Sequence, residues 1–172
     1  MAIDKNSNAY TFGFAILMVI VVGSLLAIAS QGLKTRQDKN ATDKKMMSIL
    51  SAINIDATRE NAQELYNKYV IDSKIIAGKD LSAEAFNVDI KKEFRNKNIS
   101  ITDRNHPLYI CEKDGNKYYI IPVIGTGLWG PIWGFVALES DFKTIYGANF
   151  DHKSETPGLG AEIKYASYSD QY

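Results

Sequence analysis

The chain has 172 residues, 45% of them hydrophobic and 11% aromatic, which suffices for the core of one modest domain and excludes global disorder. Its 20 basic residues are balanced by 20 acidic ones, so it has no broad positive field that would attract nucleic acid. Cys111 is its only cysteine, which excludes an intramolecular disulfide and favours a buried strand residue over a reactive thiol.

A long uncharged stretch lies near the N-terminus. From residue 6 to residue 33 no side chain is charged, and about 20 apolar residues are enough to cross a bilayer core as a helix. We therefore expect a short tail over 1–9 and a transmembrane helix over 10–32. A cleavable signal peptide is the competing interpretation, since Ala27-Ile28-Ala29 resembles a cleavage site. Signal cores usually run ~7–15 residues, so the length of this stretch favours an uncleaved anchor.

Basic residues are more frequent after the span than before it. Lys5 and the terminal amine precede it, and five basic residues follow it: Lys34, Arg36, Lys39, Lys44 and Lys45. The positive-inside rule would keep the following domain in the cytoplasm, but the rule weakens for large translocated domains. The residues themselves therefore leave the side of the membrane open.

Helical segments are expected between the span and residue 104, forming a membrane-proximal helical region over 33–104. A helix over 40–53 follows from apolar residues at helical spacing, namely Met46, Ile49, Leu50 and Ile53. A helix over 58–71 follows in the same way from Ala62, Leu65, Tyr66 and Tyr69, with Asp56 or Thr58 as its N-cap. A further buried helical edge is indicated by Phe86, Ile90 and Phe94.

The pattern changes from helical to strand-like after residue 105. Residues 108–112 and 117–124 are rich in β-branched and aromatic side chains, and Asp114-Gly115 between them fits a tight hairpin turn. Residues 132–139 and 144–150 are further strand candidates, with Gly147 as a possible bulge. Helices followed by strands predict an α+β fold with an antiparallel sheet.

The residues from Gly125 to Gly130 match the G-x-G-x-x-G pattern that opens dinucleotide-binding domains. That pattern requires a helix directly after it, whereas residues 132–138 are typical of a strand and contain a glycine. We therefore interpret the motif as a glycine-rich turn between strands. Trp129 and Trp133 are then core or sheet-face aromatics.

His152 and Glu155 have the spacing of two metal ligands on one helical face. Pro157 disfavours helical geometry at the residue before it, and no further His or Cys lies nearby to complete a ligand set. Ser154 with His152 likewise lacks the oriented partner that nucleophilic catalysis requires. We therefore predict neither a metal site nor a hydrolase here.

Residues 155–160, Glu-Thr-Pro-Gly-Leu-Gly, form a stiff loop, because the proline fixes one torsion while the glycines leave backbone amides unobstructed. Such a loop can lie against a planar ring. Pro-Gly is also an ordinary turn signal, so the residues alone leave a structural turn and a ligand loop both open.

Taken together, these motifs resemble the C subunit of the bacterial sodium-translocating NADH:quinone oxidoreductase. The resemblance rests on Gly127-Leu128-Trp129, on residues 134–138 and on His152 with residues 155–160, and it covers nearly the whole chain. The G subunit of the Rnf electron-transport complex shares the pattern from His152 to Gly160. The Gly-Leu-Trp element favours the sodium pump over the Rnf complex.

The resemblance implies an FMN domain held by one span on the periplasmic side of the bacterial inner membrane. Its flavin would relay electrons between other subunits during quinone reduction coupled to sodium export. The chain would thus act as one subunit of a translocase and be inactive in isolation. By the same resemblance, the flavin-side residues are Leu128, Trp129, Glu155, Thr156, Gly158, Leu159 and Gly160.

In one respect the sequence departs from this family. Members bind FMN through a phosphodiester to the threonine of a Ser-Gly-Ala-Thr motif, and the sequence up to Tyr172 contains no such motif. Thr156 belongs to the flavin-side loop and is not expected to take that role. We therefore expect a partial FMN-binding β-rich domain over 105–172 and a truncated gene product. The alternative function is a cofactor-free, membrane-anchored structural module of the same or an Rnf-like complex.

Overall fold

The computed structural model describes residues 7–78 and 80–165 and divides into two compact units, residues 1–42 and residues 43–172. The first unit holds most of α1 (Asn8–Ser51), a helix of 44 residues. Its apolar stretch reaches a mean hydropathy of 2.7 over 18 residues, and none of that stretch is buried. By length and composition it is a candidate membrane span near the N-terminus, as expected from the sequence.

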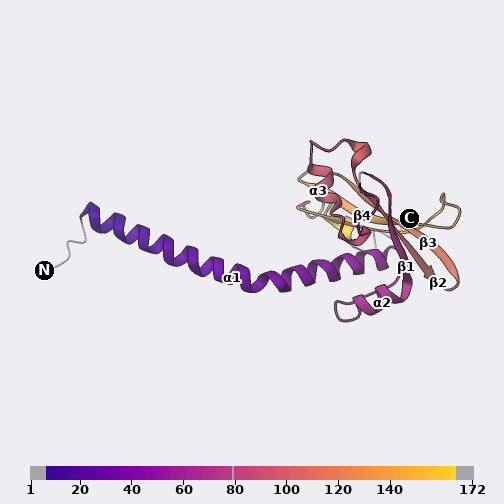
Figure 1. Cartoon of the computed structure of the whole chain (residues 1–172), viewed down its shortest axis with the longest axis horizontal. Coiled ribbons are helices and arrows are strands. Elements are labelled where there is room, and N and C mark those ends of the chain that lie inside the picture. The colour runs from indigo at the N-terminus through magenta and orange to yellow at the C-terminus, as the bar shows by residue number, and fades with distance from the viewer. Residues whose placement is uncertain (1–6, 79, 166–172) are drawn as a thin grey trace. The chain divides into compact units, whose positions relative to one another are not determined.

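The second unit combines the last turns of α1 with short helices and one sheet (Figure 1). Its other helices are α2 (Ala62–Tyr69), α3 (Ile90–Arg95) and the 3-10 turns η1 (Ala85–Asn87), η2 (Ile101–Asp103) and η3 (Ala161–Lys164). Its strands are β1 (Val70–Ala77), β2 (His106–Lys113), β3 (Asn116–Thr126), β4 (Pro131–Leu138) and β5 (Ile145–His152). The strands pair in chain order, each antiparallel to the next, which confirms the α+β class with an antiparallel sheet.

The turn between β2 and β3 has the predicted form. Asp114 and Gly115 both have positive φ, 52° and 79°, and the flanking residues Lys113 and Asn116 are cross-strand partners. Positive φ at both central residues marks the type I′ turn, whose twist matches that of the flanking strands. β2 to β5 each lie within two residues of the bounds expected from the sequence.

One face of the sheet packs against the last turns of α1. Ile49, Leu50 and Ile53 are fully buried there. They share a core with Ala52, which follows α1, and with residues of three strands. The strand residues are Tyr109 and Cys111 of β2, Tyr118 and Ile120 of β3, and Phe135 and Ala137 of β4. Burial of a large apolar side chain contributes roughly 1.5–3 kcal/mol. The predictions of a core stripe within 40–53 and of a buried Cys111 on a strand are both confirmed.

The irregularity expected at Gly147 lies where β5 meets this helix. The register of β4 against β5 shifts between Ala137 and Leu138, whose partners are Gly147 and Ile145. A Cβ at Gly147 would lie 2.6 Å from the carbonyl oxygen of Ala52. Glycine therefore permits a backbone approach between strand and helix end that other residues would block.

The helix expected over 58–71 is confirmed over 62–69 and is shorter than expected at both ends. α2 ends at Tyr69, and Val70–Ala77 forms β1, which pairs with β2. The region 33–104 is therefore not wholly helical. β-branched residues at 70 and 71 are poor helix formers, and pairing with β2 satisfies their backbone groups instead.

The N-cap expected for this helix is wrong as well. Asn61 takes the N-cap position in place of Asp56 or Thr58. Its side-chain Oδ1 accepts a hydrogen bond from the backbone N of Thr58 at 2.7 Å. The asparagine therefore stabilises the turn before α2, and its side chain makes no bond to the helical N–H groups.

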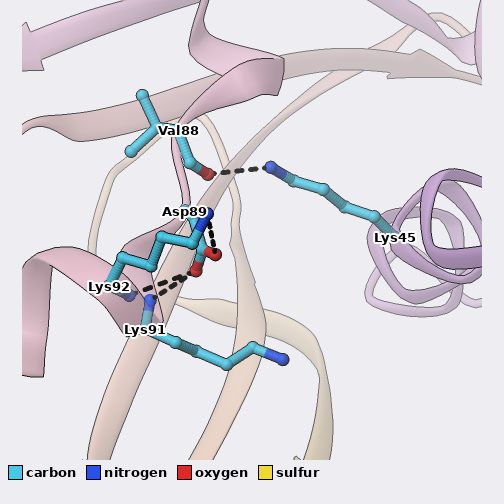
Figure 2. A network of polar contacts seen from close by, with 5 residues as sticks. All are labelled: Lys45, Val88, Asp89, Lys91 and Lys92. Carbon is cyan, nitrogen blue, oxygen red and sulfur yellow. Dashed lines mark hydrogen bonds and ion pairs between the residues drawn. The ribbon is translucent and has the colours of Figure 1, made fainter. Parts of the chain in front are cut away.

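The helical edge expected from Phe86 to Phe94 is split in two. Phe86 lies in η1, whereas Ile90 and Phe94 lie in α3. Asp89 stands between them in an extended conformation, and its carboxylate accepts from the backbone N of Lys91 and of Lys92 at 3.0 and 3.2 Å (Figure 2). An aspartate N-cap thus starts a new helix where a continuous one was expected.

Lys45 of α1 holds this break in place. Its Nζ donates to the carbonyl oxygen of Phe86. It also donates to the carbonyl oxygen of Val88 at 3.0 Å, the bond drawn in Figure 2. Burial lowers the pKa of Lys45 to about 8, while Asp89 opposes the shift and Lys91 adds to it. Two carbonyl acceptors therefore fix the segment between η1 and α3 against the end of α1.

Candidate functional site

The turn between β3 and β4 presents two large apolar side chains. The backbone N of Gly127 donates to the carbonyl oxygen of Gly130 at 2.7 Å and closes the turn. Leu128 and Trp129 lie between them, with side chains 72% and 65% exposed. β4 begins at Pro131, directly after the motif, so the glycine-rich pattern leads into a strand, as the sequence predicted.

The loop after β5 presents a third exposed apolar side chain. The carbonyl oxygen of Thr156 accepts from the backbone N of Leu159 at 3.0 Å and of Ala161 at 3.3 Å. Leu159 lies within this turn and is 69% exposed. Gly158 and Gly160 have φ of +80° and +140°. The loop is therefore a defined turn with an apolar side chain on its surface.

Glu162 stabilises this loop from its C-terminal side. Its Oε1 accepts a hydrogen bond from the backbone N of Gly158 at 2.7 Å. This bond to the ionised form lowers the pKa of Glu162. The amide of Gly158 is thus already engaged within the protein.

Glu155 joins the two loops. Its Oε1 accepts from the backbone N of Trp129 at 3.0 Å, and its side chain is among the buried charged groups of the described residues. Two further bonds run between the same segments: Ser154 Oγ donates to the Trp129 carbonyl at 3.1 Å, and the Lys153 N donates to the Pro131 carbonyl at 3.1 Å. The structure therefore joins the turn that contains Leu128 and Trp129 to the start of the loop over 155–160.

The glycine at position 127 makes this junction possible. A Cβ there would collide with Glu155 Oε1 and would lie 2.9 Å from the carbonyl oxygen of Gly130. Gly125, two residues earlier, would meet only the side chain of Ile132 at 3.8 Å. Gly127 is therefore the most closely packed glycine of this motif, and Gly130 is also close to its neighbours, since a Cβ there would lie 3.1 Å from Ser154 Oγ.

His152 supports Glu155 from the end of β5. Its Nδ1 accepts from the backbone N of Glu155 at 3.0 Å, so the neutral ring carries its proton on Nε2. That Nε2 is buried and has no hydrogen-bond partner among residues 7–78 and 80–165. Ser154 bonds to Trp129 and not to His152, so the nucleophile and base pair of a hydrolase does not form. The spacing of His152 and Glu155 reflects a turn and not a helical face.

Trp133 has a different environment from Trp129. It lies in β4, and the Nζ of Lys91 is 3.6 Å from its ring centroid, a cation–π contact. Burial is the main cause that lowers the pKa of Lys91. The interpretation as a sheet-face aromatic is confirmed for Trp133 and wrong for Trp129, which lies in the turn between β3 and β4 and is exposed.

A family model described as an FMN-binding domain matches residues 127–171, a range that contains both loops. The fold and this match define the class of the protein: an α+β chain with an FMN-binding domain after a candidate membrane helix. FMN, expected from the sequence, is the cofactor that the comparisons support.

Known proteins narrow the class further. The C subunit of the Na⁺-translocating NADH-quinone reductase of Vibrio parahaemolyticus is 29% identical over 193 residues, covering 100% of this chain and 74% of that protein. The crystal structure of the corresponding C subunit from Parabacteroides distasonis is 34% identical, with a TM-score of 0.71, and the match covers 81% of this chain and 67% of that one. Shewanella oneidensis NqrC shares the fold, with a TM-score of 0.62 at 22% identity over 75% of this chain and 67% of that one.

The chain belongs to the family of C subunits of the Na⁺-translocating NADH-quinone reductase, as the resemblance of its motifs implied. Its relatives are subunits of an oxidoreductase complex. The family is therefore one of electron-transfer subunits with an FMN-binding domain.

The described residues fit a flat ring at the surface. Leu128, Trp129 and Leu159 are exposed on two loops that are hydrogen-bonded together. Nothing lies within 4 Å of the position that a Cβ at Gly158 would occupy, so a planar group has free access to that backbone. The cavity of about 490 Å³ that Arg104 and Val123 help to line includes none of the seven candidate residues.

The sequence did not predict the hydrogen bonds that position the two loops. Glu162, Ser154 and the Nδ1 of His152 each make a bond that shapes the loops. Glu162 gives no signal in the sequence, because its partner is a backbone N–H that residue type does not reveal. The spacing of His152 and Glu155 is a signal, but by residue type it indicates only a metal or hydrolase motif.

Proposed function

We propose that this chain is the flavin-carrying subunit of a Na⁺-translocating NADH:quinone reductase, relaying electrons through FMN toward quinone in a reaction coupled to Na⁺ export. The observation that carries this proposal is the hydrogen bond from Trp129 to Glu155, which joins two loops of the FMN-binding-domain match. Other subunits of the complex would be its electron donor and acceptor. The span over 10–32 would hold it in the inner membrane, with the domain over 105–172 on the periplasmic side.

Each candidate residue has a role that follows from its position. Leu128, Trp129 and Leu159 would pack against the ring and exclude water from it, since exposed apolar side chains bind flat aromatic surfaces well. The backbone at Thr156, Gly158 and Gly160 would lie close to the ring. Glu155 would act as a positioning residue, because its carboxylate and its backbone N are both bonded within the protein.

In flavoproteins the cofactor carries out the electron transfer, and the protein binds and positions it. Bound FMN would supply the chemistry of accepting and donating electrons. The chain would supply a fixed surface, exclusion of water and the electrostatic environment of the ring. Thr156 stays within the flavin-side loop in this proposal and is not an attachment residue.

The test is FMN binding by the full chain in detergent, followed by flavin absorbance and fluorescence. We expect Trp129→Ala and Leu159→Ala each to weaken FMN binding by about fivefold or more. Leu81→Ala is the matched control, because Leu81 is similarly exposed, at 62%, in a segment outside both loops. Equal affinities for all three variants would overturn the assignment of the site.

Denaturing the loaded protein tests the mode of binding. Colour lost on denaturation would support noncovalent FMN, and retained colour would contradict the expectation that this chain has no attachment threonine. Failure to bind FMN under any condition would favour the alternative, a cofactor-free anchored module.

A further inference from the structure

We propose that the cavity between β2 and β3 binds a small molecule with an apolar body and one carboxylate, and that Arg104 receives the carboxylate. The cavity has a volume of about 490 Å³, within the ~300–1,000 Å³ range of small-molecule sites. Its lining includes residues of β1, α3, β3 and the segment before β2, among them Ile76, Ile90, Phe94, Arg104, Val123 and Ile124.

Two prolines account for the separation of β2 and β3. Pairing between these strands ends at Tyr109 and Ile120. In the same register, Pro107 would stand opposite Pro122, and neither residue has an N–H to donate. β2 continues beside β1 through Pro107, and β3 continues beside β4 through Pro122. The gap is therefore set by the sequence and does not depend on a loose strand end.

Arg104 brings a charge into this largely apolar space. Its guanidinium carbon is 5.6 Å from the ring centroid of Phe94, a distance typical of cation–π contact. Its Nε is buried and has no hydrogen-bond partner among the residues that the structure describes. A buried donor without a partner costs free energy, and the planar guanidinium matches a carboxylate with two parallel bonds.

The carboxylate of Glu93, which also lines the cavity, already accepts hydrogen bonds from within the protein. Glu93 accepts from the backbone N of Asn105 at 2.6 Å with one oxygen and from its Nδ2 at 2.8 Å with the other. Within the described part of the chain, no ion pair links Glu93 to Arg104. His106 lines the cavity too, with an exposed side chain. Arg104 is therefore the charged donor in the cavity that is left for a ligand.

The apolar lining selects the rest of the ligand. Ile90 and Phe94 of α3 and Val123 and Ile124 of β3 border the cavity. A carboxylate with an alkyl or aryl body would place its charge at Arg104 and its body against these side chains. None of the proposed flavin-side residues lines this cavity, so binding here is independent of the FMN proposal.

The test uses the full chain in lipid nanodiscs with 4-butylbenzoate as the probe and neutral 4-butylbenzamide as its matched analogue. We expect saturable binding of the benzoate by calorimetry and at least about tenfold weaker binding of the benzamide. Arg104→Gln should weaken benzoate binding by at least about tenfold and remove the preference for the charged probe. Arg95→Gln, at an exposed arginine of α3, should leave both unchanged.

A second variant keeps the test decisive if Arg104→Gln does not fold. Val123→Phe adds bulk within the cavity and should reduce binding of both probes, with folding checked by circular dichroism. The proposal is overturned if the wild type shows no saturable binding, if both probes bind equally, or if the cavity variants bind the benzoate as the wild type does.

Discussion

The side chain of Glu155 accepts a hydrogen bond from the backbone N of Trp129 at 3.0 Å, although the two residues are 26 positions apart. The bond joins the β3–β4 turn to the loop that follows β5. The carboxylate thus acts together with the bonds from Ser154 Oγ and the Lys153 N to hold the two loops in place.

Glu155→Ala should loosen both loops. Because the Trp129 amide loses its acceptor, we expect the free energy of unfolding to fall by about 1–2 kcal/mol. Hydrogen exchange at the Trp129 amide should become faster. Glu155→Gln keeps an acceptor oxygen and should retain most of the protection, and Glu60→Ala, at an exposed glutamate, is the control. Unchanged exchange at Trp129 in Glu155→Ala would contradict this role.

Gly127→Ala should damage the same junction by steric means. The added Cβ would collide with Glu155 Oε1, and overpacking of this kind costs about 1–3 kcal/mol. Thermal unfolding followed by circular dichroism measures the loss. Gly125→Ala is a control from the same motif, since its Cβ would make only an ordinary contact at 3.8 Å. Equal destabilisation by the two variants would show that Glu155 is not the cause.

Lys45→Met should remove the Nζ that donates both hydrogen bonds to the segment between η1 and α3. The carbonyl groups of Phe86 and Val88 lose their partner, and we expect a loss of about 1 kcal/mol at pH 7. Lys92→Met is the control, because Lys92 is 85% exposed and 3.8 Å from Asp89. Denaturant unfolding of the two variants measures the difference. A loss in Lys92→Met as large as that in Lys45→Met would argue against the buried lysine.

Lys45 should also make stability depend on pH. Its pKa is about 8 in the folded chain and 10.5 ordinarily, so between these values the unfolded chain keeps a proton that the folded chain has released. The wild type should therefore gain stability relative to Lys45→Met as the pH rises across this window. Unfolding by urea at pH 7, 9 and 10 measures it. The same slope in wild type and variant would refute the assignment.

Cys111 should be unreactive until the protein unfolds. It is fully buried in β2, and burial raises the pKa of its thiol from 9.0 to about 12. Thiolate is the reactive form, so a thiol reagent at pH 8 should label the native chain far more slowly than the urea-unfolded chain. Because the unfolded chain forms thiolate first, this group should lower stability as pH rises from 9.0 toward 12. Rapid labelling of the folded protein would contradict this.

The sheet was largely predictable, and β1 was not. β2 to β5 contain clear runs of β-branched and aromatic residues, and Asp114-Gly115 marked their first turn. β1 was hidden because Tyr69 and the apolar residues after it continue the helical spacing of α2. It is an edge strand in which only Ile75 is buried, so it lacks the alternation that marks a half-buried strand.

The candidate site was predictable as two segments but not as one surface. The glycines and aromatics of residues 125–130 and the proline-containing loop 155–160 stood out as separate patterns. The two segments are joined because the Glu155 carboxylate accepts from the Trp129 N–H. The spacing of these residues along the chain does not reveal that bond. Arg104 was missed for a related reason, because the residues that line its cavity belong to β1, α3, β2 and β3 and lie far apart along the chain.

The end of α1 also constrains the order of events during synthesis. Ile49 and Leu50 leave the ribosome before Phe135 and Ala137, the strand residues that share their core. A helix can form from local contacts alone, whereas the sheet needs distant partners. We therefore expect the apolar side of the α1 end to stay uncovered until β2, β3 and β4 have been synthesised, and the strands to pair against a helix that has already formed.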